Sequence, residues 1–539
     1  MSWLRLMVFC PTLLVALSVG ALTAAESSAG GGQILQLANA STDVDASDPA
    51  LAYGTLSWEI EYETCAKLVD YSDAGGTVSN ELSPDAATGM PVIGSGGRFY
   101  SFTIRPGVRF SDGTTVTAAS FADALNRDAN PTMNSPVDAF MGDVVGWDAV
   151  VDRKAKVVSG VVASGDKLTI RLTRPDGGLL DKLAMPFFCA IDPARTPVDA
   201  QGLKTLPGAG PYYIASRTVG KQLVLKVNPY YTGDRPHRAS AIVVTMNTDP
   251  QSTYLQVSNG TYAADPSGLD DPAAAAGLAK TYGINRTRFF VHSVPETDYL
   301  SLNTARSAFA SVALRKAVNY AIDRPALARV RGFDGGEATA AILPPSLSGG
   351  VAASTRYPID GPNLAKAKAL AGGRCGDIQL WHAAGPVGTP WAGILAYDLG
   401  RLGCKVTQTP FQGYALTSAA GVKGAPYDVV VAGWYEDYAD GYDFFHVLLD
   451  GRTIQTKNNN NLSYFRNSGV DGRIDAANRL TGTARARAWG LLDNFTMDEY
   501  APWAPFENQT VRDFIGPKTA GYLFVPPYGS MDLGALYLK

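Results

Sequence analysis

The residues best suited to bind a ligand lie in one short run, Gly-Trp-Tyr-Glu-Asp-Tyr-Ala-Asp at positions 433–440. Trp434 and Asp437 place an aromatic ring three residues before a carboxylate. A carboxylate accepts charge-assisted hydrogen bonds from an ammonium group, and aromatic walls shield such a pair from water. Such a pair is chemically suited to a cationic amine. A structural role is the alternative, in which Asp437 and Asp440 cap a helix over residues 442–449.

Residues for other chemistry are missing or badly spaced. Four histidines are too dispersed for a zinc site, and the acidic spacing around Gly441 does not fit an EF-hand loop. No Gly-x-Ser-x-Gly elbow, His-Glu-x-x-His motif or Cys-His nucleophile pair occurs. Glu436 and Asp437 are adjacent, so on an extended chain their side chains point apart. We expect no enzyme activity, no metal and no cofactor; a secreted hydrolase is the competing class.

The elements that must position this run form a predicted βαβ unit. Residues 378–381 read as a strand, 392–402 as a helix, and 404–407 and 427–433 as further strands. Such a crossover makes neighbouring strands parallel, and ligands of open α/β sheets bind beyond the carboxyl ends of the strands. Trp381 ends one of these strands and Trp434 follows another, which makes Trp381 a further candidate.

A second informative stretch lies near residue 100. Residues 99–105 alternate apolar and polar side chains as a half-buried strand does, and Thr117 can cap a following helix. Its twelve residues 103–114, Thr-Ile-Arg-Pro-Gly-Val-Arg-Phe-Ser-Asp-Gly-Thr, resemble the signature of family 5 extracellular solute-binding proteins, the dipeptide- and oligopeptide-binding receptors of ABC importers. Residues 206–214, 228–231, 299–303 and 312–323 resemble further family motifs in the same order. The predicted helix over residues 56–68 carries another match, Tyr62-Glu63-Thr64.

This resemblance implies an α/β, two-lobed periplasmic-binding-protein-like fold of type II, cluster C, with an extra subdomain on the first lobe. The two crossings between lobes are expected near Val294 and Trp503. The implied division is a signal peptide at 1–25, lobe I at 33–64, 206–293 and 504–539, the extra subdomain at 65–205, and lobe II at 294–503.

The resemblance also implies a function and a site. The protein would capture a peptide or amino-acid-derived ligand between its lobes and, as a monomer, deliver it to the permease subunits of an ABC importer. The family's aspartate that pairs with a peptide α-ammonium group corresponds to Asp437, and its tryptophan to Trp434. Trp503 and Phe506 lie where the family's last crossing reaches the ligand, and Asn39 lies in a loop that supplies backbone contacts. An oligosaccharide or another non-peptide solute is the alternative ligand.

The amino terminus and the charge of the chain indicate an exported protein. Arg5 precedes an apolar run over residues 6–17, and small residues at 21–25 offer a cleavage site. About 12 apolar residues are few for a membrane span, although an uncleaved anchor remains the alternative. Cys10 lies inside the apolar run, so a lipobox is lacking. A net charge of −4 argues against nucleic acid or an anionic membrane as the main partner.

Export would leave four cysteines in an oxidising compartment, which permits three pairings. We favour Cys65 with Cys189 and Cys375 with Cys404, because each pair then falls within one expected lobe. Four free buried thiols are the alternative.

Overall fold

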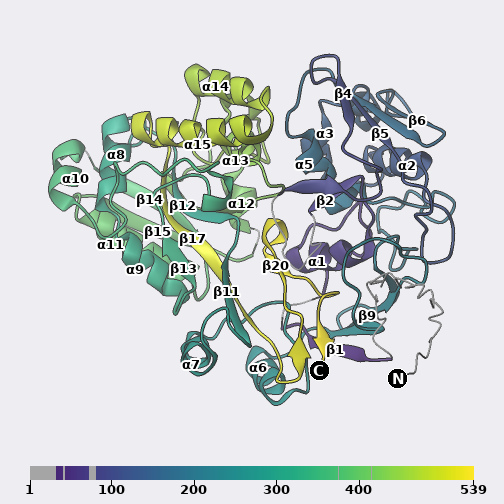
Figure 1. The fold of residues 1–539 in the computed structure, drawn as a ribbon. Coiled ribbons are helices and arrows are strands. Elements are labelled where there is room, and N and C mark those ends of the chain that lie inside the picture. Colours follow the sequence, from purple (N-terminus) through teal and green to yellow (C-terminus); the bar gives the residue numbers. More distant parts are fainter. Residues whose placement is uncertain (1–31, 41–42, 72–80, 374, 414) are drawn as a thin grey trace, which may run out of the picture.

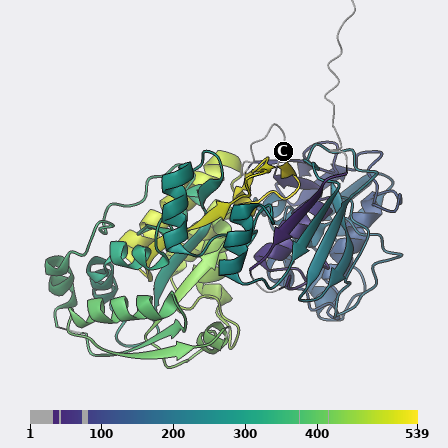
Figure 2. The same ribbon diagram turned by 90° about the horizontal axis from the view of Figure 1, so that it is seen from below.

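The computed structural model describes residues 32–40, 43–71, 81–373, 375–413 and 415–539, and the predicted signal peptide lies outside these ranges. Two lobes stand side by side, one built from purple and blue segments and the other from teal and green ones (Figure 1). The same division is visible from below (Figure 2). This is the two-lobed α/β arrangement expected from the sequence.

Lobe I is built on a four-stranded sheet with the strand order β1-β10-β9-β8. β1 pairs with β10 in parallel, and the other neighbours are antiparallel. Alternate residues of β9 and β10 are buried, as in a sheet with one covered face. The elements of this part are β1 (Ile34–Ala38), α1 (Thr55–Thr64), β8 (Tyr212–Thr218), β9 (Gln222–Val227), β10 (Ala241–Thr245), α6 (Pro250–Asn259) and α7 (Pro272–Tyr282).

Residues 65–205 contain an antiparallel sheet of their own, with the order β4-β5-β7-β6. The predicted strand after residue 98 is confirmed as β5, and the predicted helix begins after Thr117, whose N–H donates to Ser120 Oγ. The elements are β2 (Val69–Tyr71), β3 (Leu82–Pro84), β4 (Val92–Gly94), β5 (Phe99–Thr103), α2 (Ala118–Asp128), α3 (Asp138–Met141), α4 (Trp147–Val151), β6 (Val161–Ser164), β7 (Lys167–Arg171), α5 (Leu179–Leu183) and η1 (Pro186–Phe188).

Lobe II is organised around a seven-stranded sheet with the order β11-β17-β12-β16-β14-β15, in which β13 also pairs with β17. Its strands are β11 (Phe289–Ser293), β12 (Glu296–Leu302), β13 (Gly336–Ala338), β14 (Asp377–Ala383), β15 (Lys405–Phe411), β16 (Val429–Tyr435) and β17 (Trp503–Phe514). β14 is parallel to both β15 and β16. The βαβ unit predicted from the sequence is therefore confirmed, and the carboxyl ends of β14 and β16 lie at the same edge.

Helices of lobe II pack against this sheet and against each other. They are α8 (Val312–Ala321), α9 (Arg324–Ala328), η2 (Arg329–Arg331), η3 (Pro345–Leu347), α10 (Leu364–Ala371), α11 (Gly388–Gly400), α12 (Ala415–Ala420), α13 (Gly441–Leu449), η4 (Gly451–Thr453), α14 (Ser468–Asn478) and α15 (Gly482–Glu499). α11 links β14 to β15, and α13 begins six residues after β16 ends. Within the described ranges, no helix is both long enough and apolar enough to span a bilayer.

The second crossing between the lobes was predicted near Trp503, which is the first residue of β17. Residues 504–514, which we assigned to lobe I, continue β17, and this strand pairs with β12 and then with β11 in the sheet of lobe II. Phe514, the last residue of β17, already packs with Val257 and Leu278 of lobe I. The chain then continues through β18 (Thr519–Ala520), β19 (Phe524–Val525), η5 (Pro526–Tyr528), β20 (Ser530–Met531) and β21 (Tyr537–Leu538). We propose that the crossing lies within β17, beside β11.

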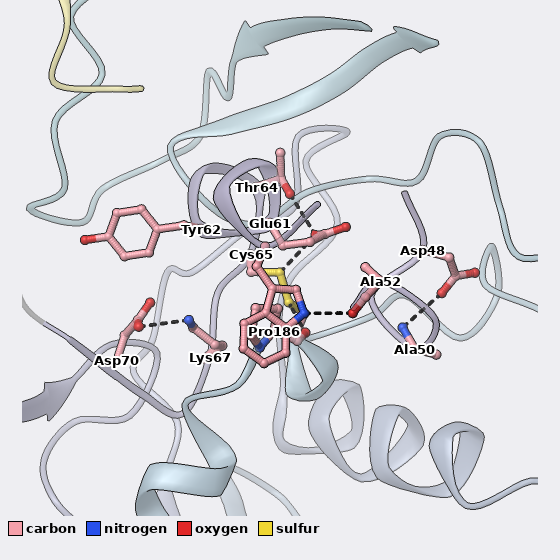
Figure 3. Close-up of a disulfide and its surroundings, with 12 residues drawn as sticks. Asp48, Ala50, Ala52, Glu61, Tyr62, Thr64, Cys65, Lys67, Asp70 and Pro186 are labelled. Atoms are coloured by element: carbon pink, nitrogen blue, oxygen red, sulfur yellow. Dashed lines mark hydrogen bonds and ion pairs between the residues drawn. A yellow bond between two sulfur atoms is a disulfide. The ribbon is translucent and has the colours of Figure 1, made fainter. Parts of the chain in front are cut away.

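Two disulfides link Cys65 to Cys189 and Cys375 to Cys404, with Cα–Cα distances of 5.2 Å and 4.7 Å. Both distances lie in the usual range for disulfides, and both predicted pairings are confirmed. The first bond joins Cys65, directly after α1, to Cys189, directly after η1 (Figure 3). The second joins the segments that lead into β14 and β15.

Candidate functional site

Asp437 lies where the two lobes touch, two residues beyond β16. Its Oδ1 accepts a hydrogen bond of 2.5 Å from the Tyr53 hydroxyl of lobe I. Its backbone N–H donates to Asp443 Oδ2 at 3.0 Å, and the residue is only 8% exposed. The carboxylate is thus held at the surface between the lobes by contacts from both of them.

Asp443, on α13, fixes the segment that carries both predicted ligand residues. Its Oδ2 also accepts a hydrogen bond of 2.8 Å from Trp434 Nε1. Burial, followed by repulsion from Asp437, holds the pKa of Asp443 well above its usual range. Burial also raises the pKa of Asp437, to about 6, although hydrogen bonds from Tyr53 and Asp443 lower it. With a pKa of about 6, Asp437 carries a negative charge at neutral pH.

Aromatic side chains of lobe I surround the Tyr53 ring that meets Asp437. The Tyr53 ring centroid lies 5.9 Å from those of Trp58 and Phe187, and Trp58 meets Phe187 edge to face. Tyr528 packs against Trp58 at 6.1 Å. This apolar wall limits the access of water to the carboxylate, which strengthens any ion pair formed there.

A cavity of about 530 Å³ adjoins the site within lobe II, at the carboxyl ends of β14 and β16. This volume lies within the range of small-molecule sites, about 300–1,000 Å³. Aliphatic and small residues of β16, α12, α13 and the loop after β14 form most of its wall, and a few aromatic and charged side chains complete it. The aromatic and charged residues of the lining are Glu296, Asp298, Tyr299, Arg331, Trp391 and Trp434. Trp434 borders the cavity and shares Asp443 with Asp437, so the cavity lies close to the Asp437 segment.

Two of the other predicted residues support this wall from behind. Trp503 is 1% exposed and stacks on Tyr299 with ring centroids 3.5 Å apart. Phe506 is fully buried and packs edge to face against Trp391 at 5.0 Å. Neither ring lines the cavity. Both belong to β17, which lies beside β12 in the sheet, and each ring packs against an aromatic residue that does line the cavity.

Trp381 and Asn39 are not part of the cavity wall in the structure. Trp381 packs against Phe411 and Tyr427, at 4.8 Å and 5.2 Å between ring centroids. Asn39 is fully buried in lobe I, at the end of β1, where its N–H donates to the Thr245 carbonyl. Both residues therefore have packing roles that the sequence did not reveal.

The alternative role as a helix cap holds for Asp440 but not for Asp437. Asp440 Oδ1 accepts from the N–H of Tyr442 at the start of α13. The same carboxylate forms a bidentate pair with the buried Arg485, at 2.6 Å and 2.7 Å. Asp437, in contrast, accepts no backbone hydrogen bond from α13 among the hydrogen bonds found in the described chain.

Glu436 is a buried carboxyl group next to the site. It is 2% exposed, and neither of its side-chain oxygens has a hydrogen-bond partner in the described part of the chain. Burial, followed by the negative charges of Asp443 and Asp181, keeps the pKa of Glu436 well above its usual range. The surface between the lobes is therefore rich in carboxyl groups, which suits a cationic ligand better than an anionic one.

One further group has metal-ligand geometry but does not form a metal site. Glu61, Cys65 and Cys189 place potential ligand atoms within 4.8 Å of one another, and no other such group was found among the described residues. The two sulfurs are joined in a disulfide, so neither is a free thiolate. Glu61 Oε2 instead accepts a hydrogen bond from Thr64 Oγ1 (Figure 3).

Sequence reasoning missed the residues of lobe I and most of the cavity wall. Tyr53 lies 384 positions from Asp437, and no local pattern marks it. Glu296 and Asp298 are two residues apart on β12, which places their side chains on the same face of the strand. That spacing, on a strand next to the one leading to Asp437, was the signal that could have identified them.

The amino-acid sequence is similar to one protein family and to several of its members. Residues 81–456 match the model described as bacterial extracellular solute-binding proteins, family 5 Middle. The chain is 25% identical over 492 residues to the probable D,D-dipeptide-binding periplasmic protein DdpA of Escherichia coli, which covers 89% of each chain. It is 22% identical to heme-binding protein A of Haemophilus influenzae, over 83% of each chain.

Solved structures share the fold. One described as clavulanic acid biosynthesis oligopeptide binding protein 2 superposes with a TM-score of 0.84 and 22% identity, covering 94% of this chain and 95% of that one. The unliganded open form of the periplasmic murein tripeptide binding protein MppA gives 0.75 and 23% identity, with 94% and 98% covered.

Proposed function

The chain belongs to the family 5 bacterial extracellular solute-binding proteins, and we propose that it captures a peptide or amino-acid-derived ligand between its two lobes. The single observation that carries this proposal is the position of Asp437. Its carboxylate is buried between the lobes, retains a negative charge at neutral pH, and has a proton donor from lobe I as its partner. A peptide α-ammonium group would be a stronger donor at the same place.

Capture of this kind requires movement of the lobes rather than covalent chemistry. β11 and β17 run side by side where the chain crosses between the lobes, so rotation about these strands would open the site. A ligand shifts the equilibrium towards the closed form only as far as it contacts that form better. Trp434 and the aromatic wall of lobe I would supply those additional contacts.

The further parts of the proposal concern partners and location. We propose that the protein is exported, binds its ligand outside the cell membrane as a monomer, and delivers it to the permease subunits of an ABC importer. Support comes from membership of the family and from the relatives that are named as periplasmic binding proteins. We also propose that the protein is a receptor and not a hydrolase, since its sequence lacks the nucleophile motifs described above.

A thermal-shift screen of residues 26–539 against short peptides, amino acids, oligosaccharides and haem tests this proposal. A ligand at one hundred times its Kd should stabilise the folded state by about 2.7 kcal/mol. We expect stabilisation by short peptides with a free amino terminus and none by the same peptides after acetylation. Mass spectrometry of the recovered peptide should show it intact. A response to oligosaccharides alone would reject the ligand class, and peptide cleavage would reject the receptor function.

A further inference from the structure

Acidic residues outnumber basic ones in the lining of the cavity next to Asp437. Glu296 and Asp298 line it from β12, and Arg331 is the only basic residue in its wall. Arg331 Nη2 contacts Asp298 Oδ2 at 2.8 Å, and its Nε lies 2.7 Å from Glu507 Oε1. Arg331 is therefore shared between two carboxylates, and its guanidinium also lies over the Trp391 ring, at 4.8 Å.

Of the two acidic residues that line the cavity, Glu296 is the one without an ion-pair partner among the described residues. Its side chain forms no hydrogen bond and no ion pair with any residue that the structure describes. Burial and the nearby Asp298 raise the pKa of Glu296 to about 8, while Arg331 opposes this rise. Desolvated carboxylates of this kind either keep a proton or pair with a cation.

The remaining wall suits a long cationic side chain. Lysine and arginine carry an apolar stem and a charged end, and the cavity offers aromatic rings together with one acidic group. Among described residues, the Trp434 ring has no stacked ring and no cation over it, and this partly buried side chain borders the cavity. An indole ring can attract a ligand cation. Tyr299, in contrast, is already stacked on Trp503.

The cavity also lies within reach of the proposed ammonium site. Trp434 borders the cavity and binds Asp443 through its indole N–H, and Asp443 accepts the N–H of Asp437. A peptide held at Asp437 by its amino terminus would therefore present a side chain near that terminus to the cavity.

We propose that this cavity receives a lysine or arginine side chain near the amino end of the bound peptide, and that Glu296 selects it. The inference rests on the proposed function, and it specifies the ligand class as basic peptides. Glu296 acts here as a specificity residue: its carboxylate pairs with the ligand cation, and the proton that it holds is released to solvent.

Calorimetric titrations with peptides that differ only in charge test this inference. Lys-Ala-Ala is compared with norleucine-Ala-Ala, and Ala-Lys-Ala with Ala-norleucine-Ala. We expect the wild-type protein to bind the better lysine peptide at least tenfold more tightly than its norleucine counterpart. In Glu296→Gln the difference should fall below threefold, through weaker binding of the lysine peptide alone. The matched control, Glu337→Gln, changes an exposed residue of β13 and should keep the full preference.

A second measurement needs no variant. Titration of the wild-type protein at pH 7 in buffers of different ionisation enthalpy should show proton release with the lysine peptide and less with the norleucine peptide. Equal affinities for the two peptides, or a preference that survives in Glu296→Gln, would overturn the role of Glu296 and leave the proposed function standing. Failure of all four peptides to bind would overturn both.

Discussion

The hydroxyl of Tyr53 in lobe I donates a hydrogen bond of 2.5 Å to Asp437 Oδ1 in lobe II. This contact joins the lobes at the point where we propose that a peptide ammonium group binds. A ligand would have to displace the phenol or share the carboxylate with it. The Tyr53–Asp437 contact therefore both favours closure of the lobes and competes with the ligand.

The first prediction concerns this competition. In Tyr53→Phe the ring and its packing remain, but the donor is lost. Hydrogen bonds to charged groups contribute about 1.5–3 kcal/mol. If the ligand displaces the phenol, we expect peptide affinity to rise severalfold, together with a larger radius of gyration of the ligand-free protein in small-angle X-ray scattering. A variant that binds peptide more weakly than wild type would show instead that the hydroxyl contacts the ligand.

The second prediction concerns the carboxylate. Asp437→Asn removes the charge but keeps the shape and size of the side chain. Removing one partner of a buried charged pair costs about 2–5 kcal/mol, which corresponds to a loss of affinity of roughly thirty- to several-thousand-fold. Calorimetry with a peptide found in the screen measures this loss. Asp377→Asn, at an exposed position where β14 begins, is the matched control and should bind as wild type does. Unchanged affinity in Asp437→Asn would refute the ammonium site.

The third prediction concerns pH and the buried Glu436. Its pKa in the folded protein lies well above the value of about 4.3 expected in an unfolded chain. The folded state therefore holds a proton that the unfolded state has lost, and this contribution to stability falls as the pH rises above about 4.3. Glu436→Gln has no proton to lose. We expect it to match wild type near pH 4 and to exceed it by at least about 1 kcal/mol at pH 8.

Urea unfolding of the ligand-free protein at the two pH values measures this difference. The control is Glu337→Gln, whose exposed side chain should give the same small effect at both values. The idea fails if wild type gains stability relative to Glu436→Gln between pH 4 and pH 8, because that would mean that the carboxylate has a favourable partner in the folded state.

Sequence patterns predicted the fold of lobe II well because they are local. The alternation and apolar runs that indicated two strands around a helix correspond to β14, α11 and β15. The ends of helices were predicted less accurately. The helix expected over residues 56–68 ends at Thr64, and the backbone of the disulfide-bonded Cys65 is already extended. β17 is twice the usual strand length, and its pairing with both β12 and β11 cannot be read from its own residues.

The site was only partly predictable, for a similar reason. Trp434 and Asp437 were predicted because their run follows an apolar strand and resembles the tryptophan and aspartate of the family's site. Aromatic residues occur both in ligand sites and in protein cores. The sequence therefore could not predict that Trp503 and Phe506 pack behind Tyr299 and Trp391. Tyr53 is brought to Asp437 only by the docking of the two lobes.

The last prediction compares the two disulfides, which close loops of very different length. Cys65 and Cys189 are 124 residues apart, and Cys375 and Cys404 are 29 apart. In the chain-entropy model the longer loop restricts the unfolded chain more, so the bonds contribute at most about 4.9 and 3.6 kcal/mol. We expect Cys65→Ser with Cys189→Ser to lower the unfolding midpoint more than Cys375→Ser with Cys404→Ser. Denaturant unfolding under oxidising conditions measures both, and each double variant serves as the control for the other. A larger loss from the second pair would show that the local packing of the β14–α11–β15 unit, and not loop length, decides what each bond contributes.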